Sequence, residues 1–174
     1  MKLPNSIPVP FPIEFIQIPA ANYAVGRSQV PDCIVIHVAE ASKAGVIADF
    51  TDPTYQKSSH FLVNQDGSIT QFVSTANQAF GNGIVDNPTS ELLLQRPGVN
   101  PNEWTVSIEH EGFAVDDFTE AQYATTTRLV KYLHDKWNIP LDSTHVIRHR
   151  EINGEKPCPG IVDVERIIRG ARQL

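Results

Sequence analysis

The feature that most restricts the fold of this chain is one short run, Cys33-Ile34-Val35-Ile36-His37-Val38, which is apolar at every position but one. Successive side chains of a strand point to opposite faces of a sheet, so a run of this kind must be covered on both faces. Its length and its β-branched residues favour a strand over a helix. The run therefore predicts a central, buried strand with a layer of structure on each side.

The remaining chain alternates between strand-like and helix-like patterns. An Asp-Gly pair at 66–67 between two apolar runs is typical of a hairpin. Thr119 and Gln122 form a capping-box pair ahead of a long helical repeat. The predicted elements are a helix at 42–50, hairpin strands at 60–64 and 68–73, a strand at 105–111, a helix at 120–137, a strand at 144–148 and a helix at 161–170. This mixture predicts an α/β fold, a single domain with a central mixed β-sheet flanked by helices.

The chain length of 174 residues suits one domain. Residues 1–31 are rich in proline, and scattered apolar residues such as Ile7 and Val9 suggest that this lead-in packs on the domain formed by residues 32–174. Residues 74–103 contain several glycines and prolines and are expected to form a long surface loop, a feature that is often functional.

Charge and hydropathy exclude several classes of partner. The net charge is −6 and no block of Lys or Arg is present, so nucleic acid is not an expected ligand. No run approaches the roughly 18 apolar residues of a membrane span. The proline-rich start does not resemble a signal peptide, which indicates synthesis in the cytoplasm. We expect a monomer, and the two cysteines cannot form a disulfide framework.

Three residues have the chemistry of zinc ligands. His37 ends the buried strand, where an imidazole is costly unless its nitrogens have partners, although a hydrogen-bonded core histidine would also satisfy this. His149 and Cys158 lie nine residues apart in a turn-rich segment. Imidazole and thiolate are ligands that zinc prefers, and three protein ligands with water in the fourth position make a catalytic site. Cys33 does not join them, because four strand residues place it about 13 Å from His37.

Two carboxylates and one lysine could complete such a site. Glu109 and Glu111 share one face of the strand at 105–111, so spacing alone does not distinguish them, and either could be a solvated edge charge. A carboxylate beside the metal could act as general base. Lys156, two residues before Cys158, could stabilise an oxyanion or be a surface lysine. His60 and His110 are interpreted as structural, and His145 as too far from the site to bind the same ion.

Several ordered blocks resemble the zinc-dependent N-acetylmuramoyl-L-alanine amidases of the amidase_2 type, a superfamily that includes phage amidases and peptidoglycan recognition proteins. The matching blocks are 18–27, Ile34-Val35-Ile36-His37, 59–69, Val106-Ser107-Ile108-Glu109, 118–123, 138–142, Val146-Ile147-Arg148-His149 and Lys156-Pro157-Cys158-Pro159-Gly160. The resemblance implies one Zn²⁺ held by His37, His149 and Cys158, with Glu109 as general base and Lys156 near the oxyanion.

The resemblance also points to a substrate cleft. Many members carry Ala-Trp-His-Ala-Gly in a cleft loop, and Gln78-Ala79-Phe80-Gly81-Asn82-Gly83 stands in that place here. Phe80 keeps the aromatic ring, the cleft histidine is missing, and Phe80 and Asn82 are the candidate cleft residues.

The implied activity is zinc-dependent hydrolysis of the amide between the lactyl group of N-acetylmuramic acid and L-alanine in peptidoglycan. The expected role is cell-wall lysis by a phage or prophage endolysin that reaches the wall after holin-type release. The alternatives are a cytoplasmic amidase that recycles anhydro-muropeptides, an exported autolysin, and a module that binds peptidoglycan without cleaving it.

Overall fold

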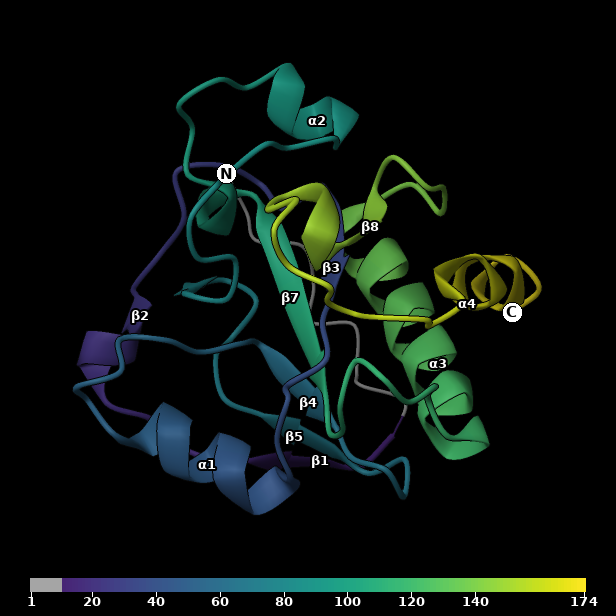
Figure 1. Ribbon diagram of the computed structural model, residues 1–174, viewed down its shortest axis with the longest axis horizontal. Helices are drawn as coiled ribbons and strands as arrows, with labels where there is room; N and C mark the ends of the chain where they lie inside the picture. The colour runs from purple at the N-terminus through teal and green to yellow at the C-terminus, as the bar shows by residue number, and fades with distance from the viewer. Residues whose placement is uncertain (1–10) are drawn as a thin grey trace.

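The computed structural model describes residues 11–174, and its centre is a six-stranded mixed sheet (Figure 1). The strand order is β1-β5-β4-β7-β3-β8. The strands are β1 (Ile13–Phe15), β3 (Cys33–Ile36), β4 (Phe61–Val63), β5 (Ile69–Gln71), β7 (Thr105–His110) and β8 (Val146–Arg148). β3 lies between β7 and β8 and runs parallel to both, whereas β4 and β5 form the predicted antiparallel hairpin. A separate pair joins β2 (Tyr23–Ala24) to β6 (Gln78–Ala79).

Helices cover the two faces of the sheet. The longest helix, α3 (Glu120–Trp137), packs with α4 (Val164–Ala171) on one face (Figure 1). Helices α1 (Lys43–Thr51) and α2 (Glu91–Leu94) pack against residues of the opposite face. Three short 3-10 helices, η1 (Ala20–Asn22), η2 (Pro101–Glu103) and η3 (His149–Glu151), complete the fold. The predicted single α/β domain with a mixed sheet flanked by helices is confirmed.

The apolar run at 33–36 is the central strand that its sequence predicts. Ile34 and Ile36 pack into the hydrophobic cluster that also contains the buried faces of α3 and α4. Cys33 and Val35 point the other way, into a cluster around Trp104. All four strand residues are fully buried, as a strand covered on both faces must be.

Helix α3 begins and ends where the sequence signals predict. The Thr119 hydroxyl accepts from the Gln122 backbone N–H, and the Gln122 side chain accepts from the Thr119 N–H, which together form a capping box. At the other end, Asn138 adopts a left-handed conformation with φ of 59°, a common way to stop a helix.

Two predicted segments differ from the structure. Residues 74–103 are not one surface loop: they contain β6, α2 and η2, because Leu92 and Leu93 of α2 are buried against the cluster around Trp104. The last helix begins at Val164 rather than 161, because the Asp163 side chain caps it by accepting from the Arg166 N–H.

The lead-in contributes to the sheet over the residues that the structure describes. β1 pairs in parallel with β5, and Ile18 is buried in a cluster with residues of α1 and β4. Residues 1–10, among them Ile7 and Val9, lie outside the described part of the chain. Within residues 11–174, no helix has both the length and the apolar character that crossing a bilayer requires.

Candidate metal centre and active site

The strand register brings three candidate site residues into one row. Ile36 of β3 is paired with Ile108 of β7 on one side and with Arg148 of β8 on the other. The next residue on each strand is therefore level with the other two, which places Glu109, His37 and His149 side by side. Residues at the same level of neighbouring parallel strands point to the same face of the sheet, and neighbouring strands lie about 4.8 Å apart. The three side chains therefore lie close together on one face, at the carboxyl end of three parallel strands. Ligand sites of α/β sheets commonly lie at this end.

Cys158 completes a group of three potential metal ligands. Ligand atoms of His37, His149 and Cys158 all lie within 4.8 Å of one another. The Cys158 loop reaches the end of β3, where the Cys158 Sγ accepts a hydrogen bond of 3.1 Å from the Val38 backbone N–H. The structure thus brings together the three residues that the sequence proposes as metal ligands.

The chemistry of this group fits a cation. His37 is buried, and its Nε2 has no hydrogen-bond partner in the part of the chain that the structure describes. The His149 Nε2 lies 3.1 Å from the carbonyl oxygen of Asn82, which can only accept, so the lone pair of this ring is on Nδ1. Burial lowers the pKa of both histidines and raises the pKa of the Cys158 thiol to about 12. Neutral imidazoles suit a metal, and a thiolate at this buried position needs a positive charge beside it.

Glu109 is the carboxylate beside the three candidate metal ligands. One of its oxygens lies 3.9 Å from the His37 Nδ1, and its side chain is 15% exposed. The other oxygen, Oε2, is buried and has no hydrogen-bond partner among the described residues. Burial raises the pKa of Glu109 to about 8, although the positive charge of Lys57 opposes this. A carboxyl group whose pKa lies near neutrality can both take and return a proton.

The raised pKa of Glu109 predicts that the free energy of unfolding of the metal-free protein falls as the pH rises. The folded-state pKa, about 8, lies above the ordinary value of 4.5, so stability is lost as the pH rises between these values. We expect Glu109→Gln to gain stability relative to the native protein over this window, by at most about 1.4 kcal/mol per pH unit. Urea unfolding of chelator-treated proteins at several pH values measures this. A stability difference that does not change with pH would contradict it.

Glu111 has a different role, which the sequence alone does not reveal. Its two carboxylate oxygens accept from the backbone N–H groups of Lys43 at 2.9 Å and Gln65 at 3.0 Å. The chain leaves the strand direction after His110, and Gly112 follows with φ of 135°. Glu111 therefore joins the start of α1 to the hairpin turn and does not share the environment of Glu109.

Removing the Glu111 carboxylate is expected to reduce stability without affecting catalysis. Glu111→Ala leaves two backbone N–H groups without their acceptor, which costs about 1–3 kcal/mol of unfolding free energy. Urea denaturation measures the loss, and kcat measured well below the unfolding midpoint should remain close to the native value. A large fall in kcat at unchanged stability would assign Glu111 to the reaction.

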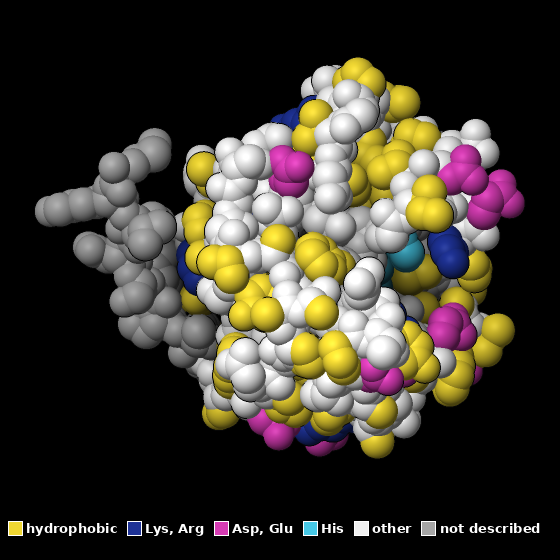
Figure 2. Space-filling model, turned by 90° about the vertical axis from the view of Figure 1, so that its left-hand side faces the viewer, with side chains coloured by type: hydrophobic (Ala, Val, Ile, Leu, Met, Phe, Trp, Pro, Cys, Tyr) yellow, Lys and Arg dark blue, Asp and Glu magenta, His cyan; other side chains and the backbone are white. Residues whose placement is uncertain are grey.

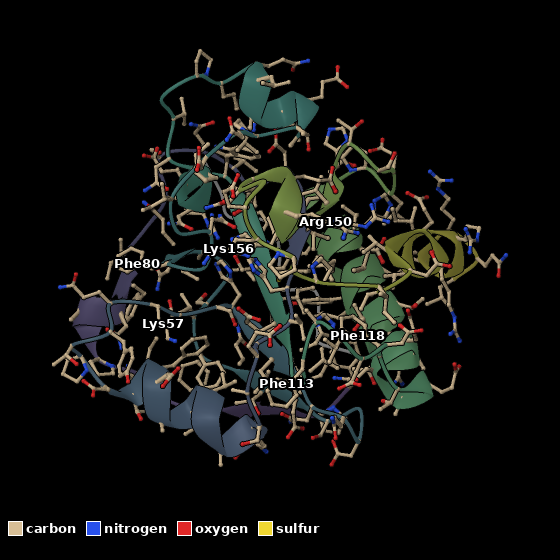
Figure 3. The ribbon with its side chains drawn as sticks, viewed as in Figure 1. Lys57, Phe80, Phe113, Phe118, Arg150 and Lys156 are labelled. Carbon is tan, nitrogen blue, oxygen red and sulfur yellow. The ribbon has the colours of Figure 1, made fainter. Side chains whose placement is uncertain are left out.

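A cavity of about 420 Å³ lies beside His149, one of the three candidate metal ligands. Its lining includes His149, Phe80, Asn82, Lys57 and Lys156. In Figure 3, Phe80, Lys57 and Lys156 are drawn to the left of Phe113 and Arg150. Figure 2 shows a histidine in a hollow of the surface beside a basic side chain. The site is therefore accessible from solvent.

The two candidate cleft residues are placed differently. Phe80 is half-buried and lines the cavity. The Asn82 side chain is instead buried, and its amide donates to the Thr105 hydroxyl at 2.8 Å. Asn82 meets the site through its backbone carbonyl, which accepts from His149.

Lys57 is the residue of this cavity that sequence reasoning missed. Its ammonium group forms an ion pair with Asp49 at 2.6 Å. It lies three residues before His60 in a segment with no periodic pattern, so nothing in the sequence distinguishes it from other surface lysines.

The remaining histidines and the second cysteine lie apart from the ligand group. Cys33 is in the core, as predicted. The His60 Nδ1 accepts from the Ser107 backbone N–H, and the His145 Nδ1 lies 2.7 Å from Asp142. His110 is buried on the opposite face of β7 from Glu109.

Comparisons with known proteins show which family this chain matches. The family described as N-acetylmuramoyl-L-alanine amidase (Amidase_2) matches residues 27–161. N-acetylmuramoyl-L-alanine amidase A of Achromobacter lyticus is 27% identical over 156 residues, which cover 79% of this chain and 78% of that protein.

Two solved structures show that the fold is shared. AmpD, as its Se-Met derivative, has a TM-score of 0.73 at 22% identity, and the match covers 91% of this chain and 93% of that one. The catalytic domain of XlyA has a TM-score of 0.67 at 23% identity, with 92% and 99% covered.

Proposed function

The chain belongs to the N-acetylmuramoyl-L-alanine amidase family, and we propose that it uses one zinc ion to hydrolyse the amide between the lactyl group of N-acetylmuramic acid and L-alanine. The observation that carries the proposal is the grouping of His37, His149 and Cys158 within 4.8 Å, with the buried carboxylate of Glu109 next to it. Three ligands rather than four are typical of a catalytic zinc site, and a general base beside them favours an enzyme over a binding module.

Zinc suits the donors that these residues offer. His37 and His149 present neutral imidazole nitrogens and Cys158 presents sulfur, a combination that zinc accepts readily. When bound, zinc supplies Lewis acidity that polarises an amide carbonyl and makes water more acidic. The carbonyl of Asn82 fixes the ring of His149, a support of the kind that orients metal ligands.

Glu109 is the proposed carrier of the proton. Its buried Oε2 has no hydrogen-bond partner among residues 11–174 and is available to accept a proton from the attacking water. The raised pKa of Glu109 lets the carboxyl hold this proton until the amide nitrogen of L-alanine leaves and takes it. Hydrolysis then yields a free lactyl carboxylate and a peptide with a free L-alanine amino group.

Lys156 is the proposed partner of the negative charge that develops on the carbonyl oxygen. It lines the same cavity as His149, and its positive charge adds to the burial that lowers the pKa of His149. A cation placed here stabilises an oxyanion more than the neutral amide, so its effect belongs to the transition state.

Lys156→Met is expected to lower kcat by about 10²-fold with a smaller change in KM, because the charge acts mainly on the transition state. Lys131→Met is the matched control, since Lys131 forms its ion pair with Asp135 on α3, away from the cavity. Steady-state kinetics on a soluble muropeptide measure both parameters. An unchanged kcat with a raised KM would assign Lys156 to substrate binding alone.

The proposed substrate is intact peptidoglycan and the proposed role is lytic. The cavity beside the ligands is rimmed by the exposed residues Lys57, Ile84 and Lys156, which leaves it open to a polymer. One solved structure with the same fold is an endolysin amidase, LysCS from Clostridium intestinale, at 20% identity and a TM-score of 0.64.

Purified sacculi and soluble anhydro-muropeptides, each with and without a zinc chelator, test the substrate. The proposal predicts that sacculi release peptides with a free N-terminal L-alanine. This release should stop when chelator is added and return when zinc is restored. Turnover of soluble muropeptides alone would indicate recycling, and zinc binding without turnover of either substrate would indicate a binding module.

A further inference from the structure

His110 has more specific contacts than a core histidine needs. It is buried on the face of β7 that also carries Val106 and Ile108, next to the hydrophobic cluster beneath α3. Its Nδ1 lies 2.8 Å from the backbone carbonyl oxygen of His37, and its Nε2 lies 2.7 Å from the hydroxyl of Thr126 on α3. The ring stacks on Phe118, with 3.9 Å between the ring centroids. Phe118 lies toward α3 in Figure 3.

These contacts define which atoms donate. A backbone carbonyl only accepts, so the hydrogen of the His110 ring is on Nδ1 and is donated to His37. Nε2 then carries a lone pair and accepts from the Thr126 hydroxyl. Thr126, His110 and the His37 carbonyl are thus linked in order, each donating to the next.

The series continues through the peptide bond between His37 and Val38. The carbonyl of this peptide accepts from His110, and its N–H, which belongs to Val38, donates to the Cys158 Sγ at 3.1 Å. Every donor in the series points toward the sulfur. Hydrogen bonds arranged in this way polarise one another, so a bond to the carbonyl strengthens the bond made by the N–H. One peptide therefore connects two of the three metal ligands to α3.

We propose that His110 and Thr126 are positioning residues for the metal centre: they hold the His37–Val38 peptide and, through it, the side chains of His37 and Cys158 in the arrangement that binds a divalent cation. The inference rests on the proposed function, because it requires that these ligands bind zinc. The stack on Phe118 requires only a flat ring, whereas the two hydrogen bonds require the ring nitrogens of an imidazole.

Two pairs of variants separate positioning from packing. Thr126→Val removes the hydroxyl at nearly constant volume, whereas Thr126→Ser keeps it. His110→Leu removes the donor to the His37 carbonyl, whereas His110→Asn keeps a donor close to the place of Nδ1. Thr125→Val is the matched control, because Thr125 is a buried neighbour on α3 whose hydroxyl donates to Gly67 instead.

The measurement is the zinc affinity of each protein, determined by competition with a chromophoric chelator, together with the absorption spectrum of the cobalt-loaded form. Residues that hydrogen-bond to metal ligands without binding the metal themselves typically contribute 10- to 100-fold to the metal affinity. We therefore expect His110→Leu and Thr126→Val to bind zinc at least about 10-fold more weakly than the native protein. Their sulfur-to-cobalt charge-transfer band should also shift. Thr126→Ser, His110→Asn and Thr125→Val should remain closer to the native protein in both respects.

Equal affinity and equal cobalt spectra for Thr126→Val and Thr125→Val would overturn the inference and leave His110 as a packing residue. Should His110→Leu fail to fold, the threonine pair alone decides. A native protein that binds no zinc would instead overturn the proposed function, so the two failures are distinguishable. None of these readouts requires substrate.

Discussion

Replacing Glu109 with glutamine is expected to lower kcat by about 10²- to 10⁴-fold while zinc remains bound, because the amide cannot take a proton from water. The substitution keeps the size of the side chain, and Glu109 does not belong to the group of three metal ligands. Steady-state kinetics on a muropeptide and the zinc content of the same sample measure both effects.

The matched control for this prediction is Glu111→Gln. It changes a carboxylate two residues away whose oxygens bind backbone N–H groups of Lys43 and Gln65. It should retain most of the activity. A fully active Glu109→Gln, or equal losses for the two variants, would show that Glu109 is not the base.

Replacing Cys158 with alanine is expected to remove zinc and activity together. The sulfur is one of only three ligands in the group, and its loss should weaken zinc binding by more than about 100-fold, the upper range for changes outside the ligands themselves. Metal analysis after dialysis and kinetics on the same sample test this result.

Cys33→Ala is the control, since Cys33 is also a buried free cysteine but packs in the cluster around Trp104. It should lose some stability and keep its zinc. Retention of stoichiometric zinc and of activity by Cys158→Ala would contradict the proposed ligand set.

The parts of the fold that the sequence predicts best are those that local physics determines. The apolar run at 33–36 has to be a buried strand, and the capping box at Thr119 and Gln122 defines the start of α3. The alternation along β7 correctly separates Glu109 from His110, because side chains of a strand point to opposite faces in turn. The donor chemistry of His37, His149 and Cys158 makes them candidate ligands, the resemblance implies the same set, and the geometry brings the three together.

The parts that the sequence does not predict depend on long-range packing. The register that aligns Ile36 with Ile108 and Arg148 is set by the whole sheet. Alternation cannot separate Glu109 from Glu111, which share a face in an ideal strand; they differ because β7 ends at His110. Helix α2 has only four residues, about one turn, so no repeating helical pattern shows in its sequence.

The polar contacts of the site are also hidden from the sequence. The support that Asn82 gives to His149 comes from a backbone carbonyl, which no residue type signals. The contacts of His110 depend on how α3 packs against β7, so its sequence context suggests only a core residue.

Digestion of peptidoglycan in ¹⁸O-labelled water, followed by mass spectrometry of the products, tests most directly which bond is cleaved. Hydrolysis of the proposed amide places the label in the lactyl carboxylate of N-acetylmuramic acid and releases peptides that begin with L-alanine. We predict this pattern for the native protein with zinc, and the same labelled products formed at least about 10²-fold more slowly by Glu109→Gln. Label in a carboxylate of the peptide, or in a sugar, would show that a different bond is cleaved and would contradict the proposed activity.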